Sequence, residues 1–390
     1  MLATQESAAN QRITKFIGLS LVVGTIVLVA IAIWWTQPRG ATIHAEDIQR
    51  AIAPPRLSGS HPCVFADISG GKVVTGLGQC VTPTDHSPAE DRLETDLRYG
   101  AFVLRQADLA VRDGFDAPLV RAYASDDWGG PSRVHAFGVN SNHFFDIAPV
   151  GSRRPYTYLV LKLEDSDFLY FKRISQGTGF ADAVYLHTET ATRFYKSTIA
   201  WNGNGWTLRM ADGSEMKFPE AYLAKNLAQC APYIMKDATG QELVLRRDAE
   251  RNLEEVRTPR GRWIRFRYDS AARIVEAGDD AGNFSRYSYN SDGLLTHVMH
   301  SSGGQRTYEY AGQLMTAVID EQGRTLVRNE YKSRLPTRQL FANGDLYSYS
   351  YRATPGKSYL NTVVVTLPDG TQKELDVKSS VSDFLRRSTP

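Results

Sequence analysis

The sequence has almost no net charge, because 45 Lys and Arg residues face 43 Asp and Glu residues and leave +2 over 390 residues. Proteins that bind phosphate backbones concentrate basic side chains on one surface, so this balance argues against a nucleic-acid partner. Cysteine is scarce as well, with three residues and no Cys-x-x-Cys pair. The rest of the composition, with 19 Tyr, 31 Gly and 17 Pro, favours strands and turns over helices.

Signatures of catalysis and of cofactor binding are missing too. The sequence contains no Gly-x-Ser-x-Gly, no His-Glu-x-x-His and no P-loop. Gly76 and Gly78 form a Gly-x-Gly that lacks the third glycine and the following helix of a dinucleotide site. We therefore expect a protein that is not an enzyme and that carries no cofactor and no metal.

Long apolar runs are absent except for one, residues 16–35, which contain no charged side chain. A helix of that length spans about 30 Å, the thickness of the hydrocarbon core of a bilayer. Trp34 and Trp35 end the run where an interfacial aromatic belt belongs. We interpret it as a single-pass transmembrane anchor after a short cytoplasmic tail, residues 1–15. The alternative is a cleaved signal peptide, whose apolar region is usually shorter and is followed by a small-residue cleavage site.

Two of the cysteines bear on the compartment of the body. Cys63 and Cys80 bracket a Gly-rich stretch, CVFADISGGKVVTGLGQC, whose spacing permits a hairpin closed by a disulfide. A disulfide would place the body outside the cytoplasm, in the periplasm or at the cell surface, while two reduced, buried thiols are the alternative. We interpret Cys230 as a small core residue.

The chain between the anchor and the middle of the sequence predicts a stalk and then a β-rich domain. Residues 36–92 are rich in Pro, Gly, Ser and His, which is typical of a stalk. Over residues 93–235 short apolar stretches alternate with turn signals, as in antiparallel strands. WNGNGW, residues 201–206, is a strong hairpin signal. Residues 220–230 predict either one brief helix or a connecting turn.

A repeat of about 21 residues fills residues 236–352. Glycines punctuate it at steps of 19 to 22 residues, at Gly240, Gly261, Gly282, Gly303 or Gly304, Gly323 and Gly344. Tyrosines recur beside them at steps of 20 or 21 residues, at Tyr268, Tyr289, Tyr310, Tyr331 and Tyr351. Self-similarity at a fixed period indicates one supersecondary unit stacked on copies of itself.

The unit that fits this period is a two-stranded hairpin. In RWIRFRY, residues 262–268, alternation puts Ile264, Phe266 and Tyr268 on one face and Arg265 and Arg267 on the other. A turn follows, then a return strand, RIVEA, and a second turn that needs glycine for its positive φ. Successive hairpins are expected to pair edge to edge into a long twisted sheet, and residues 353–390 to add a capping hairpin and a polar tail.

These repeats resemble the YD repeat of the RHS protein family. The pattern Tyr-Asp-x-x-Gly-x-Leu appears in degenerate form as YDSAARI, YNSDGLL, YAGQL and YKSRL. Residues 99–127 and 137–147 are similar to the β-rich domain that precedes YD repeats in that family, with matches at Arg121, Ala122, Tyr123, Phe137 and Gly138.

The resemblance implies a mainly β fold, in which a β-rich N-terminal domain continues into a YD-repeat strip of stacked antiparallel hairpins. Long members of the family enclose a C-terminal toxin and release it by self-cleavage at an aspartyl core motif. This chain lacks such a core motif, so we expect neither a closed shell nor a toxin cargo.

The tyrosine ladder is the main candidate binding site. Its aromatic residues are expected to share one sheet face, as a platform for a carbohydrate or a protein partner; they are Phe266, Tyr268, Tyr287, Tyr289, Tyr308, Tyr310, Tyr331, Tyr349 and Tyr351. The alternative is that cross-strand aromatic pairs hold the strip together. The opposite face carries arginines that either meet an anionic surface or are solvated, Arg265, Arg267 and Arg286.

Other polar groups have plainer interpretations. His297 and His300 are three residues apart on an expected strand, so they point to opposite faces and cannot easily share a metal. His135 and His143 are either site groups or partly buried structural histidines. The acidic stretch EDSD, residues 164–167, is either a cation site or a solvated turn.

Three functions remain open from the sequence. The first is a non-enzymatic, membrane-anchored, extracytoplasmic scaffold that binds a cell-envelope polymer, such as a carbohydrate, or a protein partner. The second is a component of an RHS-type toxin or contact-dependent delivery system that works with a separate partner chain. The third is an envelope hydrolase within residues 93–235, which would need carboxylates or histidines to converge in space.

Overall fold

The computed structural model describes residues 64–67, 72–76, 92–97, 100–126, 134–153, 155–188, 193–220, 224–353 and 360–376. All of them belong to one compact unit, Gly59–Pro390. The span predicted at residues 16–35 lies outside the described residues, as do Cys63 and Cys80. Within the described ranges, no helix is long and apolar enough to cross a membrane.

The mainly β class predicted from the sequence is confirmed. The described residues contain two 3-10 turns, η1 (Phe144–Asp146) and η2 (Leu227–Cys230), and otherwise strands and loops. The side chain of Asn226 caps η2 by accepting a 3.2 Å hydrogen bond from the amide of Gln229. Over residues 220–230 the described part therefore shows a connecting turn rather than a regular helix, and residues 221–223 lie outside it.

A small antiparallel sheet forms the first part of the described chain. Its strands, in spatial order, are β1 (Val64–Asp67), β2 (Lys72–Gly76), β3 (Arg92–Asp96), β4 (Ala101–Val111), β5 (Ala117–Ala124) and β8 (Ser141–His143). Strands β1 and β2 lie between the two cysteine positions and pair as an antiparallel hairpin, which β3 extends. A separate pair, β6 (Val134–His135) with β7 (Gly138–Val139), lies in the connection from β5 to β8. We call the six-stranded sheet, without β6 and β7, the small sheet.

A long antiparallel sheet follows, in which each strand pairs with the next along the chain. Its first strands are β9 (Ala148–Gly151), β10 (Tyr158–Lys162), β11 (Phe168–Arg173), β12 (Val184–Leu186), β13 (Thr198–Trp201), β14 (Gly205–Arg209), β15 (Glu215–Pro219) and β16 (Ile234–Lys236). The hairpin predicted at WNGNGW joins β13 to β14, with Trp201 opposite Trp206. The sheet continues without a break through the boundary expected near residue 235, since β16 pairs with β17.

The repeats supply the rest of the long sheet as a run of hairpins. Their strands are β17 (Glu242–Arg247), β18 (Leu253–Arg257), β19 (Trp263–Tyr268), β20 (Ile274–Asp279), β21 (Phe284–Tyr289), β22 (Leu295–His300), β23 (Gln305–Ala311), β24 (Leu314–Ile319), β25 (Thr325–Lys332), β26 (Leu335–Phe341) and β27 (Leu346–Ala353). The predicted edge-to-edge pairing of hairpins is confirmed. We call β17–β27 the repeat strip. A further hairpin, β28 (Leu360–Thr366) with β29 (Gln372–Asp376), pairs with β27.

Recurring turn residues explain why the repeats form hairpins. Gly282 has φ +88°, and a Cβ there would meet open space, so only its backbone conformation calls for glycine. Asp279, three residues earlier, accepts hydrogen bonds through Oδ1 from the amides of Ala281 and Asn283. At the other end of the hairpin the turn residue is Gly293 in one repeat but Ala272 in the preceding one, which adopts φ +58° without glycine's freedom.

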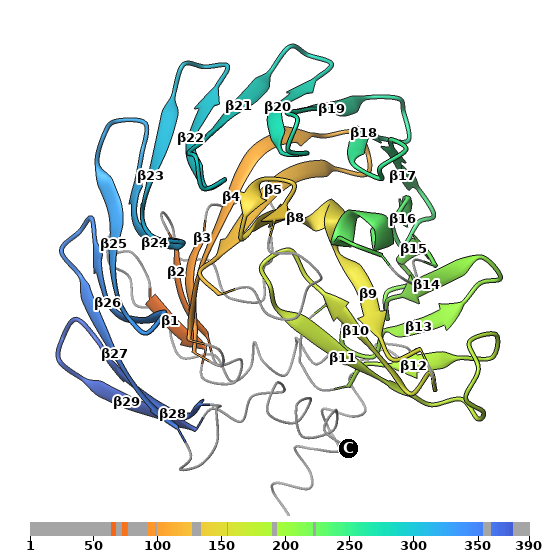
Figure 1. Cartoon of the computed structure of the whole chain (residues 1–390), viewed down its shortest axis with the longest axis horizontal. Helices are drawn as coiled ribbons and strands as arrows, with labels where there is room; N and C mark the ends of the chain where they lie inside the picture. The colour runs from red at the N-terminus through yellow and green to blue at the C-terminus, as the bar shows by residue number, and fades with distance from the viewer. Residues whose placement is uncertain are drawn as a thin grey trace, which may run out of the picture. The chain divides into compact units, whose positions relative to one another are not determined.

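The repeat strip curves around the small sheet. Strand β4 contacts β20, β21 and β26, strands that are up to six positions apart in the long sheet. Figure 1 shows β4 and β5 inside the curve of the hairpins. The face of the strip turned toward β4 and β5, which we call the inner face, is therefore buried against polypeptide, and the main hydrophobic core lies between the two sheets.

Candidate functional site

The aromatic residues of the predicted binding face lie on the inner face of the repeat strip. Phe266, Tyr287, Tyr308 and Tyr349 are buried, and Tyr268, Tyr289, Tyr310, Tyr331 and Tyr351 are half-buried. Tyr287 packs against Phe137 of the β6–β7 connection, with 4.8 Å between ring centroids. A ligand would have to displace the small sheet to reach the buried rings, so their role in binding stays a prediction.

The repeated tyrosine itself forms a seam between hairpins. The hydroxyl of Tyr268 donates to the carbonyl oxygen of Leu253 at 2.9 Å, and that of Tyr310 donates to Leu295 at 2.8 Å. Each acceptor lies 15 residues earlier, at the start of the return strand of the preceding hairpin. The register of the hairpin shifts immediately before each of these tyrosines. These bonds support the alternative stated from the sequence, in which the ladder holds the strip together.

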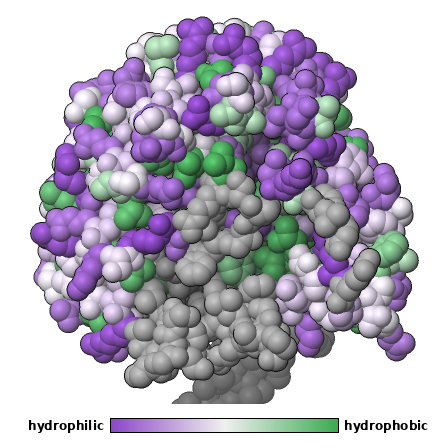
Figure 2. Space-filling view, in the orientation of Figure 1, coloured by the Kyte–Doolittle hydropathy of each residue, from purple (hydrophilic) through white to green (hydrophobic). Residues whose placement is uncertain are grey.

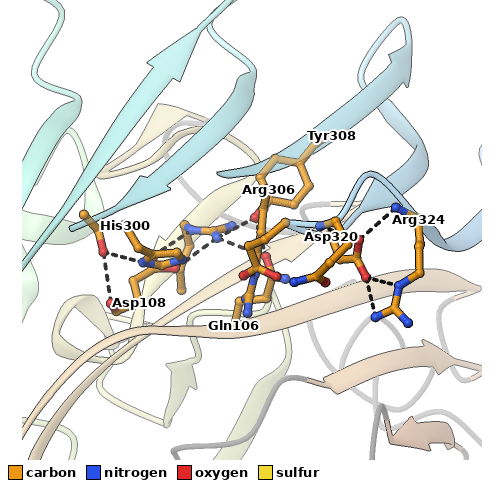
Figure 3. Close-up of polar contacts among 11 residues, drawn as sticks. Gln106, Asp108, His300, Arg306, Tyr308, Asp320 and Arg324 are labelled. Atoms are coloured by element: carbon orange, nitrogen blue, oxygen red, sulfur yellow. Dashed lines mark hydrogen bonds and ion pairs between the residues drawn. The ribbon is translucent and has the colours of Figure 1, made fainter. Parts of the chain in front are cut away.

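A buried polar cluster joins the small sheet to the inner face, and Figure 3 shows part of it. Strand β4 supplies Gln106 and Asp108, β5 supplies Arg121, and the strip supplies Tyr287 and Tyr308. Arg121 donates through Nε to Asp108 Oδ2 at 3.0 Å and through Nη2 to the Tyr308 hydroxyl at 2.8 Å. Tyr287 donates to Asp108 Oδ2 at 3.0 Å, and Tyr308 donates to Gln106 Oε1. We call these five residues the Arg121 cluster.

Burial and the neighbouring charges together set the protonation states of the cluster's side chains. Burial raises the pKa of Tyr308 to about 12, although the positive charge of Arg121 opposes it. Burial and the negative charge of Asp108 also raise the pKa of Tyr287 well above its ordinary value. Burial would lower the pKa of Arg121, but Asp108 and both tyrosines hold it well above its ordinary value. At neutral pH the cluster therefore contains a guanidinium cation and two protonated phenols.

A serine and a histidine lie next to the cluster, a pairing that in hydrolases activates a nucleophile. Ser285 Oγ is 3.0 Å from His300 Nδ1, and it also donates to the backbone carbonyl oxygen of Asp108 at 2.9 Å. Ser285 is fully buried between the two sheets. A substrate cannot reach its hydroxyl in this arrangement, so the geometry favours a packing role. His297 is opposite the exposed Ser288, so the two histidines lie on opposite faces as the strand alternation predicted.

His143 and Asp146 converge with Arg247 at the end of β8. Arg247 Nη1 donates to Asp146 Oδ1 at 2.8 Å, and His143 Nε2 is 3.8 Å from Asp146 Oδ2. His143 is fully buried, and neither ring nitrogen has a hydrogen-bond partner. Burial lowers the pKa of His143, against the opposing charge of Asp146. Burial would raise the pKa of Asp146, but His143 and Arg247 hold it below its ordinary value. His135 contributes a smaller electrostatic effect to both.

The solvated turn considered for EDSD is wrong. Glu164 and Asp165 are buried, and both form ion pairs with the guanidinium of Arg105 on β4. Asp165 also accepts a hydrogen bond from the amide of Asp167 within the turn between β10 and β11. Across the described residues, no group of three or more His, Cys, Asp or Glu side chains is arranged to hold a metal ion.

The arginines of the outer face are paired across strands. Arg265 Nε lies 2.8 Å from Glu255, and Arg286 Nε lies 2.7 Å from Glu276. Arg267 Nε is 3.6 Å from the same Glu276 carboxylate. The outer face thus alternates in charge, which weakens the case for an anionic surface as its partner. Cys230 is a buried free thiol, and burial raises its pKa to about 11.

The Arg121 cluster was not predicted from the sequence, although the residues on which the family resemblance rests lie in and around it. Arg121 forms the centre of the cluster. The hydroxyl of Tyr123 donates to the carbonyl oxygen of Gln313 and accepts from the amide of Met315. A Cβ on Gly138 would lie 2.2 Å from the carbonyl oxygen of Gly293. The matched motif residues are therefore the points where the small sheet and its β6–β7 connection dock on the strip.

Comparison with known proteins adds little. Neither a protein-family model nor a curated protein matches the chain. Among solved structures, the crystal structure of TcdB2-TccC3-TEV matches at 10% identity with a TM-score of 0.25 and covers 81% of this chain and 16% of that one. The Photorhabdus luminescens Tc holotoxin pore matches at 10% identity with a TM-score of 0.25, covering 73% and 16%. The chain spans only 16% of the length of these structures, the likeness extends at most to a distant β-repeat fold, and we base no argument on it.

Proposed function

We propose that this protein is a non-enzymatic scaffold of the RHS type, anchored in a membrane by residues 16–35, whose β-body lies outside the cytoplasm and binds a cell-envelope polymer or a protein partner. The observation that carries the proposal is the Arg121 cluster. Its charged and hydroxyl groups bond to one another between the two sheets, so they serve to fix the small sheet on the repeat strip. Partners then meet the outer surface and the loops.

The charged and hydroxyl groups of the Arg121 cluster are buried, which supports a structural role for them. A buried ion pair adds little net stability compared with apolar packing, but losing one partner is strongly destabilising. Such a cluster therefore favours one arrangement of the two sheets over alternatives. Ser285, His143 and Asp146 are buried in the same interface, and the half-buried His300 lies against Ser285, so a substrate would not reach the serine hydroxyl.

A second candidate is a component of an RHS-type delivery system that works with a separate chain. The specific observation in its favour is that the inner face of the strip wraps polypeptide, here the chain's own β4 and β5. A face built to hold polypeptide would suit a partner chain as well. Purification of the full-length protein from its native cells tests this candidate, because it predicts a second chain in stoichiometric amount.

The first proposal is tested with full-length protein in mild detergent and sedimented envelope material. One portion of the material is treated with protease, and another with periodate, which cleaves the vicinal diols of sugars. Capture that survives protease but not periodate supports a polymer ligand, and the reverse supports a protein partner. No capture of any portion contradicts the proposal.

A further inference from the structure

An aromatic cluster extends from the main hydrophobic core to the surface around the ends of β12–β14. The ring of Phe180, in the loop between β11 and β12, meets that of Trp201 edge-to-face, with 4.8 Å between centroids. Trp201 meets Trp206 at 5.2 Å, and Tyr156 meets Phe180 at 5.9 Å. We call these four residues the Phe180 cluster. None of them belongs to the tyrosine ladder.

The cluster passes from core to surface. Trp206 is 1% exposed, Tyr156 and Trp201 are half-buried, and Phe180 is 44% exposed. On the described part of the chain, Phe180 is the one aromatic among the large hydrophobic side chains that are exposed. The exposed part of the Phe180 ring, held against half-buried rings, offers an aromatic surface on which the apolar face of a ligand can pack.

The loop that carries Phe180 is fixed in place. Arg173 donates from Nη1 to the carbonyl oxygens of Tyr156 and Gly179 and from Nη2 to that of Gln176. Asp182 adds an ion pair with the same guanidinium at 3.2 Å. A pinned loop loses little conformational entropy when a ligand binds, so the ring is preorganised.

Polar groups border the rings. Trp206 Nε1 donates to Glu220 Oε2 at 2.6 Å, and Arg153 Nε is 3.3 Å from the other oxygen of that carboxylate. The hairpin tip after Trp201 carries Asn202 and Asn204, both exposed. Asn202 is fixed by the tip itself, since its Nδ2 donates to Thr207 Oγ1 at 3.0 Å and its Oδ1 accepts from the backbone amide of Asn204 at 3.1 Å. The side-chain amide of Asn204 offers both a donor and an acceptor. Aromatic surface with a few fixed polar groups is typical of small-ligand sites.

The exposed apolar surface here is small, because Phe180 and Ile174 are the large hydrophobic side chains of this loop that are exposed. The other large exposed hydrophobic residues, apart from Ile174 of the same loop, are scattered on other elements: Val134, Val244 and Leu340. Over the described part of the face in Figure 2, hydrophobic residues lie in small groups among hydrophilic ones. A sugar ring, with an apolar face and hydroxyls on its rim, fits this small mixed surface.

We infer that the Phe180 cluster is a carbohydrate-binding site, in which a sugar ring stacks on the exposed ring of Phe180, which Trp201 supports edge-to-face, and a sugar hydroxyl bonds the side-chain amide of Asn204. The inference rests on the proposed function and names the ligand class and the place where it binds. The proposed site therefore lies on the surface of the long sheet and not on the buried tyrosine ladder.

The test is co-sedimentation of the full-length protein with insoluble cellulose, chitin and purified peptidoglycan. We expect capture by at least one of them, about two- to twelvefold weaker for Phe180→Ala, because an aromatic contact contributes about 0.5–1.5 kcal/mol. Phe180→Tyr keeps the ring and should bind within about twofold of the unchanged protein. Trp263→Ala is the matched control, since Trp263 is half-buried on the outer face under the guanidinium of Arg265.

The outcomes separate the site from the function. If the polysaccharide is captured equally by Phe180→Ala and Trp201→Ala, with melting curves that show both variants folded, the site is wrong while the proposed function stands. If envelope material is captured only through a protease-sensitive component, the ligand is a protein and the carbohydrate assignment is overturned. If none of the three polysaccharides captures the protein, the carbohydrate assignment fails, and if sedimented envelope material does not capture it either, the proposed function fails as well.

Discussion

The hydroxyl of Tyr289 donates a 2.6 Å hydrogen bond to the carbonyl oxygen of Ile274, 15 residues earlier in the chain. The same relationship recurs at Tyr268, Tyr310 and, with a spacing of 16 residues, Tyr331. Removing the hydroxyl leaves a carbonyl between two hairpins without its partner. We expect Tyr289→Phe to lower the free energy of unfolding by about 1 kcal/mol, measured by chemical denaturation.

Tyr351 provides the matched control for that prediction. It stands at the next position of the ladder, but its buried hydroxyl has no hydrogen-bond partner. Tyr351→Phe should therefore leave stability unchanged or raise it slightly. Equal losses of stability in Tyr289→Phe and Tyr351→Phe would contradict the claim that the tyrosine hydrogen bonds join neighbouring hairpins.

The ion pair between Arg121 and Asp108 predicts strong coupling. Arg121→Met leaves the Asp108 carboxylate buried without its cation, so we expect a loss of about 3–5 kcal/mol. The double variant Arg121→Met, Asp108→Leu removes both charges. Its loss of unfolding free energy should be smaller than the sum of the losses in the two single variants. A double-mutant cycle measured by denaturation checks this. Arg262→Met, which breaks the solvent-accessible pair with Asp280, is the control and should have little effect.

The close approach of Gly138 to Gly293 predicts a steric effect. Ala at either Gly138 or Gly282 is strained by a positive φ, +83° and +88° respectively. At Gly282 the added methyl group meets open space, so only the backbone strain remains and the free energy of unfolding should fall by about 1 kcal/mol. At Gly138 it would lie 2.2 Å from a backbone oxygen, and the β6–β7 connection would have to shift. Thermal unfolding should show a clearly larger loss for Gly138→Ala, and equal losses would contradict this docking.

The buried His143 and the half-buried His300 predict a loss of stability in acid. The pKa values of His143 and His300 are lowered, chiefly by burial, so the folded state binds fewer protons than the unfolded state below the ordinary value of about 6.5. Their contribution is present above pH 6.5 and is lost as pH falls through the lowered values. His143→Phe should make the slope of stability between pH 6.5 and pH 5 shallower by up to about 1.4 kcal/mol per pH unit.

The same variant has a second expected property. The ring of His143 packs among Phe137, Phe145 and Phe266, and its nitrogens make no hydrogen bonds, so Phe should be accepted at pH 7. In this variant Asp146 loses the effect of His143 but keeps its hydrogen bond from Arg247, which also lowers the pKa of this carboxyl group, so Asp146 affects stability at lower pH than the histidine does. An unchanged slope would contradict the neutral, buried state of His143.

The repeat architecture could be predicted because its signals are local. Turn glycines such as Gly282 fix a hairpin within a few residues, and the alternation in RWIRFRY decides which side chains face inward. The period of the tyrosines then implied stacking of identical units. The register shift before Tyr289 was not predicted, since it depends on a carbonyl acceptor in the preceding hairpin.

The interior contacts could not be predicted from sequence in the same way. Arg121 and Tyr308 are 187 residues apart in the sequence. No local sequence pattern predicts that two strands so far apart in the chain pack against each other. For the same reason the local pattern of EDSD indicates a turn in solvent or a cation site, although Arg105, about 60 residues earlier, pairs with its carboxylates. The motif residues Arg121, Tyr123 and Gly138 gave the one sequence signal for this interface, through the family resemblance.

Hydrogen exchange of the full-length protein tests the central claim, that the small sheet and the repeat strip are held together through the Arg121 cluster. In Arg121→Met, the account predicts faster exchange of backbone amides in β4 and β5 and, together with them, in β21 and β23, while Arg262→Met leaves all four strands protected. Faster exchange in β4 and β5 alone, with the protection of β21 and β23 unchanged, would contradict it.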